Sequence, residues 1–231
     1  MDRFANAAPG VGSGVMRTSH PFRLLALVLA LLGLSLPAAT ALAANAFEVQ
    51  LPAGLRDGPQ DGRLLLIFAP ADQAPTQEPR FLVNWDGDAI PFFGTDVEGW
   101  RPGSSRKVDA AAFGFPVRSL ADLPPGDYRV QAFLNRYETF RLGDGRVLKL
   151  PPDKGEGQQW REKPGNLYSR PVSLRWRGAL DASPLPKLVL SEVIPPLPQF
   201  QDTPWVKYVR IRSERLSKFW GRDTYLGAFV T

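Results

Sequence analysis

The chain contains no cysteine, and its one histidine is His20. The lack of cysteine excludes disulfides and thiol catalysis, so the folded state must be held together by apolar burial. The lack of a histidine after His20 excludes a Ser-His-Asp triad, a Cys-His pair and the usual zinc sites from the rest of the chain. A Gly-x-Ser-x-Gly motif is also absent. We therefore predict no catalytic residue, no metal site and no cofactor in the chain as given.

Long apolar runs are scarce, and the one that stands out extends from Leu24 to Leu36. It is shorter than the about 20 residues that span a bilayer. Basic residues precede it and small residues follow it, which is the pattern of a secretory signal. We predict a signal peptide over residues 1–43, with cleavage after Ala43 or as late as Ala46 and with Met16 as an alternative start. The protein is then exported, to the periplasm or the cell exterior, without a stable membrane span; an uncleaved anchor is the alternative.

No strong excess of one charge is present, since 28 lysines and arginines face 23 aspartates and glutamates. Residues 1–43 hold more basic than acidic residues, so their removal makes the excess smaller still. The bases between Lys207 and Lys218 alternate with apolar residues, as on a solvated strand face. We therefore predict no nucleic-acid partner.

Room for long helices is also lacking, because 23 prolines and 21 glycines separate short apolar runs. In the run from Asp127 to Leu134 the apolar residues alternate, which places Tyr128 and its i+2 neighbours on one face of a strand. The preceding Pro125-Gly126 turn is typical of a tyrosine corner, although a plain turn before a core tyrosine is the alternative. We predict a mainly β protein, with an immunoglobulin-like or fibronectin-like β-sandwich over residues 44–194. The predicted strands of this domain are Phe47–Leu51, Arg63–Ala69, Phe81–Trp85, Tyr128–Asn135, Arg146–Leu150, Val172–Trp176 and Leu188–Val193.

Two predicted loops, Asn84–Gly103 and Pro151–Pro171, are rich in aromatic residues. Loops of this length are usually either functional or disordered, and aromatic content favours order. Exposed rings there could stack on sugars, so the ligand-binding candidates are Trp85, Trp100, Trp160 and Tyr168. Burial in the core is the alternative for most of the six tryptophans, above all for Trp176.

Carboxylate pairs are the remaining catalytic option, because two acids can hydrolyse a glycoside when they flank the bond. The first of the two loops carries Asp86, Asp88, Asp96 and Glu98. Their spacing fits a solvated turn or a weak calcium site as well as it fits catalysis, and no twelve-residue calcium loop is present.

A proline-rich stretch over residues 195–204 predicts an extended linker. Beyond it, Trp205–Arg212 and Tyr225–Thr231 are predicted strands, and Ser213–Phe219 is a predicted turn or short helix. A hairpin of two strands is marginal in water, so this segment is expected to need a partner.

The run VKYVRIRSERLSKFWGRDTYLGA, from Val206 to Ala228, resembles the entry into the α/β-hydrolase domain of secreted esterases of the enterochelin-esterase-like type. The stretches GEGQQW at Gly155 and PGNLYS at Pro164 are similar to the β-sandwich that precedes the hydrolase in that family. The resemblance implies that residues 205–231 are the first hairpin of a truncated hydrolase domain. The nucleophile, acid and histidine would all follow Thr231.

Together with the signal pattern, the resemblance implies an accessory N-terminal module of an exported carboxylic-ester hydrolase, whose partner is the missing C-terminal domain in cis. The alternative is a free-standing secreted β-sandwich that binds glycans or a protein through its aromatic loops. An ester or a glycan is thus the expected substrate or ligand class.

Overall fold

The computed structural model describes residues 46–73, 76–84, 88–157, 159–179, 181 and 183–231. The predicted signal peptide and Trp85 therefore lie outside the described residues. Within the described part of the chain, no helix is both long and apolar enough to cross a membrane.

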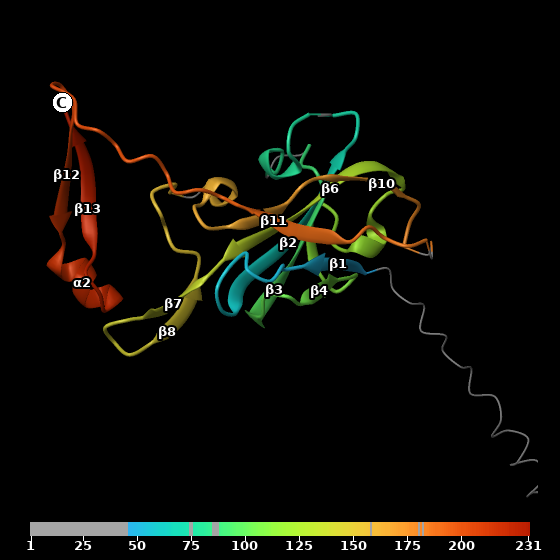
Figure 1. Ribbon diagram of the computed structural model, residues 1–231, viewed down its shortest axis with the longest axis horizontal. Coiled ribbons are helices and arrows are strands. Elements are labelled where there is room, and N and C mark those ends of the chain that lie inside the picture. The colour runs from blue at the N-terminus through green and yellow to red at the C-terminus, as the bar shows by residue number, and fades with distance from the viewer. Residues whose placement is uncertain (1–45, 74–75, 85–87, 158, 180, 182) are drawn as a thin grey trace, which may run out of the picture. The chain divides into compact units, whose positions relative to one another are not determined.

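Strands dominate the described residues, as predicted (Figure 1). Before the proline-rich stretch the strands are β1 (Phe47–Gln50), β2 (Gln60–Pro70), β3 (Phe92–Trp100), β4 (Ser105–Val108), β5 (Phe113–Phe115), β6 (Gly126–Arg136), β7 (Glu138–Arg141), β8 (Val147–Leu150), β9 (Leu167–Ser169), β10 (Val172–Trp176) and β11 (Leu188–Val193). Short 3-10 turns occur at Pro79–Phe81 (η1), Leu120–Asp122 (η2) and Trp160–Glu162 (η3). After that stretch come β12 (Lys207–Arg212), the helix α2 (Glu214–Trp220) and β13 (Tyr225–Val230).

One curled sheet contains nine of these strands. Its order is β4-β1-β11-β9-β6-β2-β3-β5, and β10 also pairs with β6. The long strands β2 and β6 run antiparallel at its centre over nine residue pairs. By contrast, β1 pairs in parallel with β11, so the first and the last strand of this sheet in chain order lie side by side. The hairpins β7-β8 and β12-β13 are separate two-stranded sheets.

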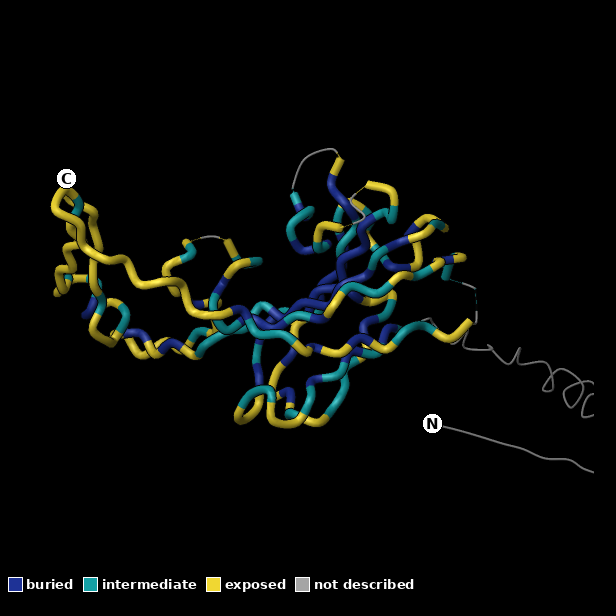
Figure 2. The backbone as a smooth tube through the Cα atoms, turned by 45° about the horizontal axis from the view of Figure 1, so that its top comes forward, coloured by how far each residue is buried: buried dark blue, intermediate teal, exposed yellow. Residues whose placement is uncertain are grey.

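The central strands are buried on both faces, and their backbone is dark blue in Figure 2. Because strand side chains alternate, Leu64, Leu66 and Phe68 of β2 enter the main core. Leu65 and Ile67 enter a smaller core on the opposite face, together with Phe133 of β6. Burial on both sides explains why β2 is an almost continuous apolar run.

Most of the predicted strands are found, but not the one predicted at Phe81–Trp85. Pro79 begins a 3-10 turn there instead, since its ring fixes φ and removes a ladder donor. The prediction of a loop over Asn84–Gly103 is also wrong for Phe92–Trp100, which form β3. Phe93, Val97 and Trp100 of this strand are buried against the main core, although charged residues lie between them.

The predicted alternation in β6 is confirmed, because Tyr128, Val130, Ala132 and Leu134 all belong to the main core. The predicted tie of a tyrosine corner is present as well. The Tyr128 hydroxyl donates to the Pro124 carbonyl at 2.9 Å, and burial raises the pKa of this phenol. The hydrogen bond closes the turn that leads into β6, one of the two longest strands of the sheet.

Tyr128→Phe is expected to lower the free energy of unfolding by about 0.5–1.5 kcal/mol, the usual net contribution of one hydrogen bond. The ring contact with Phe68, at 5.9 Å between centroids, should survive this change. Urea unfolding followed by tryptophan fluorescence measures the difference. Tyr225→Phe is the matched control, because Tyr225 lies on an exposed strand, and it should change stability by less than about 0.5 kcal/mol.

Candidate functional site

The structure does not bring the predicted ligand-binding aromatics together on one surface. Trp100 is fully buried in the main core, and its indole N–H donates to the Ser104 carbonyl at 3.3 Å. A fully buried indole has no face left for a sugar ring, so the prediction for Trp100 does not fit its position. Trp176 is buried as expected, and its indole N–H donates to the Leu123 carbonyl at 3.0 Å.

Trp160 and Tyr168 pack on the smaller core rather than projecting from their loops. The Trp160 ring meets Phe133 edge to face, with 5.0 Å between the ring centroids. The guanidinium of Arg80, itself almost fully buried, lies 4.0 Å from the centre of the Tyr168 ring. Both rings are therefore used in packing, which for Trp160 is the role that the alternative interpretation of the tryptophans assigns.

Two acidic residues of the first predicted loop, Asp96 and Glu98, are paired with bases rather than with each other. Asp96 forms an ion pair with Arg63 at 2.9 Å, and Glu98 lies 3.5 Å from the Lys149 ammonium. Asp86 lies outside the described residues, and Asp88 is exposed. Across the described ranges, no three acidic, histidine or cysteine side chains gather as a metal site would require. The paired acids are therefore not arranged as a glycosidase carboxylate couple.

The most unusual surface of the described residues is the hairpin β12-β13, whose strand residues are all exposed (Figure 2). Directly opposite residues in an antiparallel pair share a face. The pairs Val209 with Ala228 and Ile211 with Leu226 therefore lie on one side. We call this side the apolar face, formed by Val209, Ile211, Leu226, Ala228 and Val230. Ile211 is 63% exposed and Leu226 is 56% exposed, so this face has no cover among the described residues.

The opposite side of the hairpin is aromatic and basic. The guanidinium of Arg210 lies 3.9 Å from the centre of the Tyr225 ring, and the Tyr208 and Phe229 rings are 5.2 Å apart. Arg212 pairs with Asp223 at 2.8 Å, a contact that raises the pKa of this guanidinium. Arg210 and Arg212 thus have partners within the hairpin, and Lys207 pairs with Asp202 just before it.

The helix between the two strands is built from local capping signals. Ser213 caps its N-terminus by accepting the Leu216 N–H at 3.3 Å, and Gly221 ends it in the left-handed conformation at φ 64°. The helix contacts the β7-β8 hairpin, where the Gly143 N–H donates to the Phe219 carbonyl at 2.9 Å. A Cβ at Gly143 would collide with the Lys218 carbonyl, so this close approach requires glycine. This contact fixes the β12-β13 segment at the end that carries α2, while the apolar face of β12-β13 stays uncovered.

Comparison with protein-family models, with curated proteins and with solved structures gives no match. The resemblance of residues 206–228 to an esterase family thus remains a prediction from the sequence.

The sequence predicts ligand binding at the aromatic loops, whereas most of the exposed large apolar side chains lie after residue 204. Trp205 is 81% exposed, the most exposed large apolar side chain among the described residues. The signal for this surface is present in the sequence, because both strands of the hairpin carry apolar residues at every second position.

Proposed function

We propose that this chain is the accessory N-terminal module of an exported carboxylic-ester hydrolase. In this proposal a hydrolase domain in the same polypeptide packs on the apolar face of β12-β13 and supplies the nucleophile, acid and histidine. The observation that carries the proposal is the exposure of that face on a segment whose sequence resembles the start of such a domain. Contiguous exposed apolar surface on a soluble protein commonly marks an interaction site.

The geometry of the hairpin supports a sheet-forming partner in particular. Both outer edges of the two-stranded sheet are free of strand partners among the described residues. A free edge can accept a further strand through its backbone N–H and C=O groups. A hairpin of this size is marginal in water without a third strand or a packed layer. A hydrolase sheet would supply both the neighbouring strand and the cover for the apolar face.

For residues 44–194 we propose an immunoglobulin-like domain, and for residues 1–43 an export signal. The tyrosine tie at the start of β6 favours an immunoglobulin-like arrangement. Export, to the periplasm or the cell exterior, is supported by the signal pattern of residues 1–43. In the whole enzyme the β-rich part would act as a scaffold and could form one wall of the substrate cleft.

The purified chain is expected to hydrolyse p-nitrophenyl acetate no faster than buffer with heat-treated protein, because it contains no histidine after residue 20. Release of nitrophenolate measures the rate. Turnover above this background that a single substitution within the chain abolishes would overturn the proposal.

The frame beyond the codon for Thr231 provides a second test. We expect this reading frame to continue into a Gly-x-Ser-x-Gly motif followed by a histidine. The longer protein that it encodes should hydrolyse esters. A stop codon directly after Thr231, together with a monomeric and inactive product, would count against a hydrolase domain in cis.

A further inference from the structure

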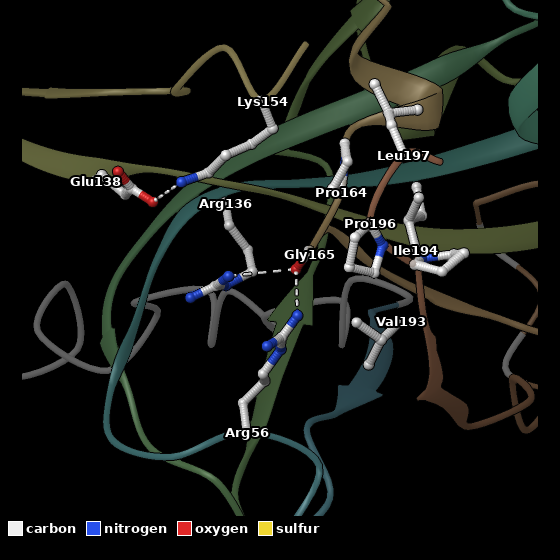
Figure 3. A pocket seen from close by; sticks show the side chains of 11 residues that line it. Arg56, Arg136, Glu138, Lys154, Pro164, Gly165, Val193, Ile194, Pro196 and Leu197 are labelled. Carbon is white, nitrogen blue, oxygen red and sulfur yellow. Dashed lines mark hydrogen bonds and ion pairs between the residues drawn. The ribbon is translucent and has the colours of Figure 1, made fainter. Parts of the chain in front are cut away.

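A cleft of about 650 Å³ lies where the end of β6, the loop after β1 and the proline-rich stretch meet (Figure 3). This volume is within the range of about 300–1,000 Å³ that small-molecule sites occupy. One part of its wall is basic, with Arg56, Arg136 and Lys154. Glu138 is the one acid of the lining, and it is paired with Lys154 at 2.5 Å. The two arginines are therefore the uncompensated charges of the cleft.

The two guanidinium groups converge on one acceptor, as the dashed lines in Figure 3 show. Arg56 and Arg136 each donate to the Gly165 carbonyl at 3.3 Å. Neither forms an ion pair with a carboxylate among the described residues, and the Nε of Arg56 is buried without a hydrogen-bond partner. Burial, followed by the charge of Arg56, lowers the pKa of Arg136. Two like charges that share one neutral acceptor would be stabilised by an anion between them.

The arginines are held in place by packing and by hydrogen bonds. The Nε of Arg136 donates to the Gln60 side chain at 2.6 Å, which orients its guanidinium. Gly165 has φ 86°, and a Cβ there would lie only 3.2 Å from the nearer arginine nitrogen. Its N–H donates to the Ile194 carbonyl at 2.8 Å, which ties the acceptor loop to the opposite wall. The site is thus preorganised by three segments that are distant in the sequence.

The loop that brings Lys154 and Gly165 to the cleft is anchored by a buried ion pair. The side chains of Lys163 and Glu156 are 6% and 1% exposed, with 3.4 Å between the charged atoms. Glu156 also accepts the backbone N–H of Lys154 at 2.8 Å. A buried pair of this kind holds its loop firmly, because breaking it would leave an uncompensated charge in the interior.

The rest of the wall is apolar, and it is formed by Val193, Ile194, Pro195, Pro196 and Leu197. Figure 3 shows Val193, Ile194 and Leu197 on the side of the cleft away from the two guanidinium groups. Leu197 is 42% exposed, so it leaves an accessible apolar surface for a bound molecule. A ligand that fits both halves has a negative group at one end and an apolar body at the other.

We infer that this cleft binds an organic carboxylate with an apolar body, with the carboxylate between Arg56 and Arg136 and the body on the Ile194 to Leu197 wall. Planar guanidinium groups match the two oxygens of a carboxylate, which favours this anion. Inorganic phosphate would use the basic half alone. This site is distinct from the apolar face of β12-β13 and does not depend on the proposed hydrolase function.

Titration of the full chain with 3-phenylpropanoate, followed by amide chemical shifts, tests the assignment. Shifts are expected at Gly165 and Ile194, two residues that line the cleft. The neutral amide of the same acid should bind at least about tenfold more weakly, because charge-assisted hydrogen bonds are about twice as strong as neutral ones. Inorganic phosphate should also bind more weakly. Equal affinity for the acid and its amide overturns the inference, and tighter binding of phosphate reassigns the cleft to inorganic anions.

Arg56→Gln is expected to weaken binding of the acid about tenfold, since it removes one of the two charges. Arg101→Gln is the matched control, because Arg101 is exposed and lies outside the cleft. Leu197→Asp provides a second variant at an exposed position, and it should weaken binding by placing a negative charge on the apolar wall. Unchanged affinity in both Arg56→Gln and Leu197→Asp would overturn the inference.

Discussion

Phe47→Ala is expected to lower the free energy of unfolding by about 3–5 kcal/mol, the range for removing a buried aromatic ring. Phe47 is fully buried at the start of β1. Its ring meets Phe68 edge to face at 5.4 Å and stacks on Trp176 at 6.2 Å between centroids. The substitution therefore leaves a cavity between β1, β2 and β10, none of which pairs with another of the three. A domain of ordinary stability, about 5–15 kcal/mol, would lose a large share of it.

Urea unfolding at constant temperature measures this loss as a lower midpoint with an unchanged slope. Phe113→Ala removes the same number of atoms from a ring that is 64% exposed, so it should change stability by less than about 0.5 kcal/mol. A loss below about 1 kcal/mol in Phe47→Ala would show that β1 is not an integral part of the core.

Amide hydrogens of β12 and β13 are expected to exchange at least about a thousandfold faster than those at the centre of β2 and β6. The central strands are buried on both faces, so their amides exchange only through global unfolding, at a cost of about 5 kcal/mol or more. The hairpin strands have exposed residues throughout and a single ladder between them. Mass spectrometry of deuterated peptides from the intact chain measures both regions in one sample.

Protection of β12-β13 equal to that of β2 would show that the hairpin is stable without a further partner, and it would remove the main support for a docking domain. In a longer protein that contains the proposed hydrolase domain, the same peptides should become protected. The β2 and β6 peptides serve as the internal control, because their exchange should not depend on the added domain.

The local elements of this protein follow closely from its sequence. The alternation of Tyr128 with its i+2 neighbours predicted the inward face of β6, and Ser213 with Gly221 delimits the short helix α2. The strand β11 was predicted with its observed bounds, Leu188–Val193. Such features depend on neighbours within a few residues, so periodicity and capping residues suffice to recognise them.

The strand β3 was missed because its apolar residues are interrupted by Thr95, Asp96 and Glu98. Its position is decided by pairing with β2, where Leu66 faces Phe93 and Leu64 faces Thr95. Asp96 is tolerated on this strand because Arg63 lies directly opposite and pairs with it. Cross-strand partners of this kind are not visible in either segment alone.

By itself, the sequence determined the mainly β character of the chain, the lack of triad and zinc chemistry after His20, and the hairpin at its C-terminal end. Only the tertiary structure decided which aromatics are buried, as for Trp100, and which charges meet, as for Arg56 and Arg136. The physical reason is separation along the chain. These two arginines are brought to one carbonyl by the pairing of β6 with β2 and by the loop before β9, and neither contact leaves a periodic signal in the residues around it.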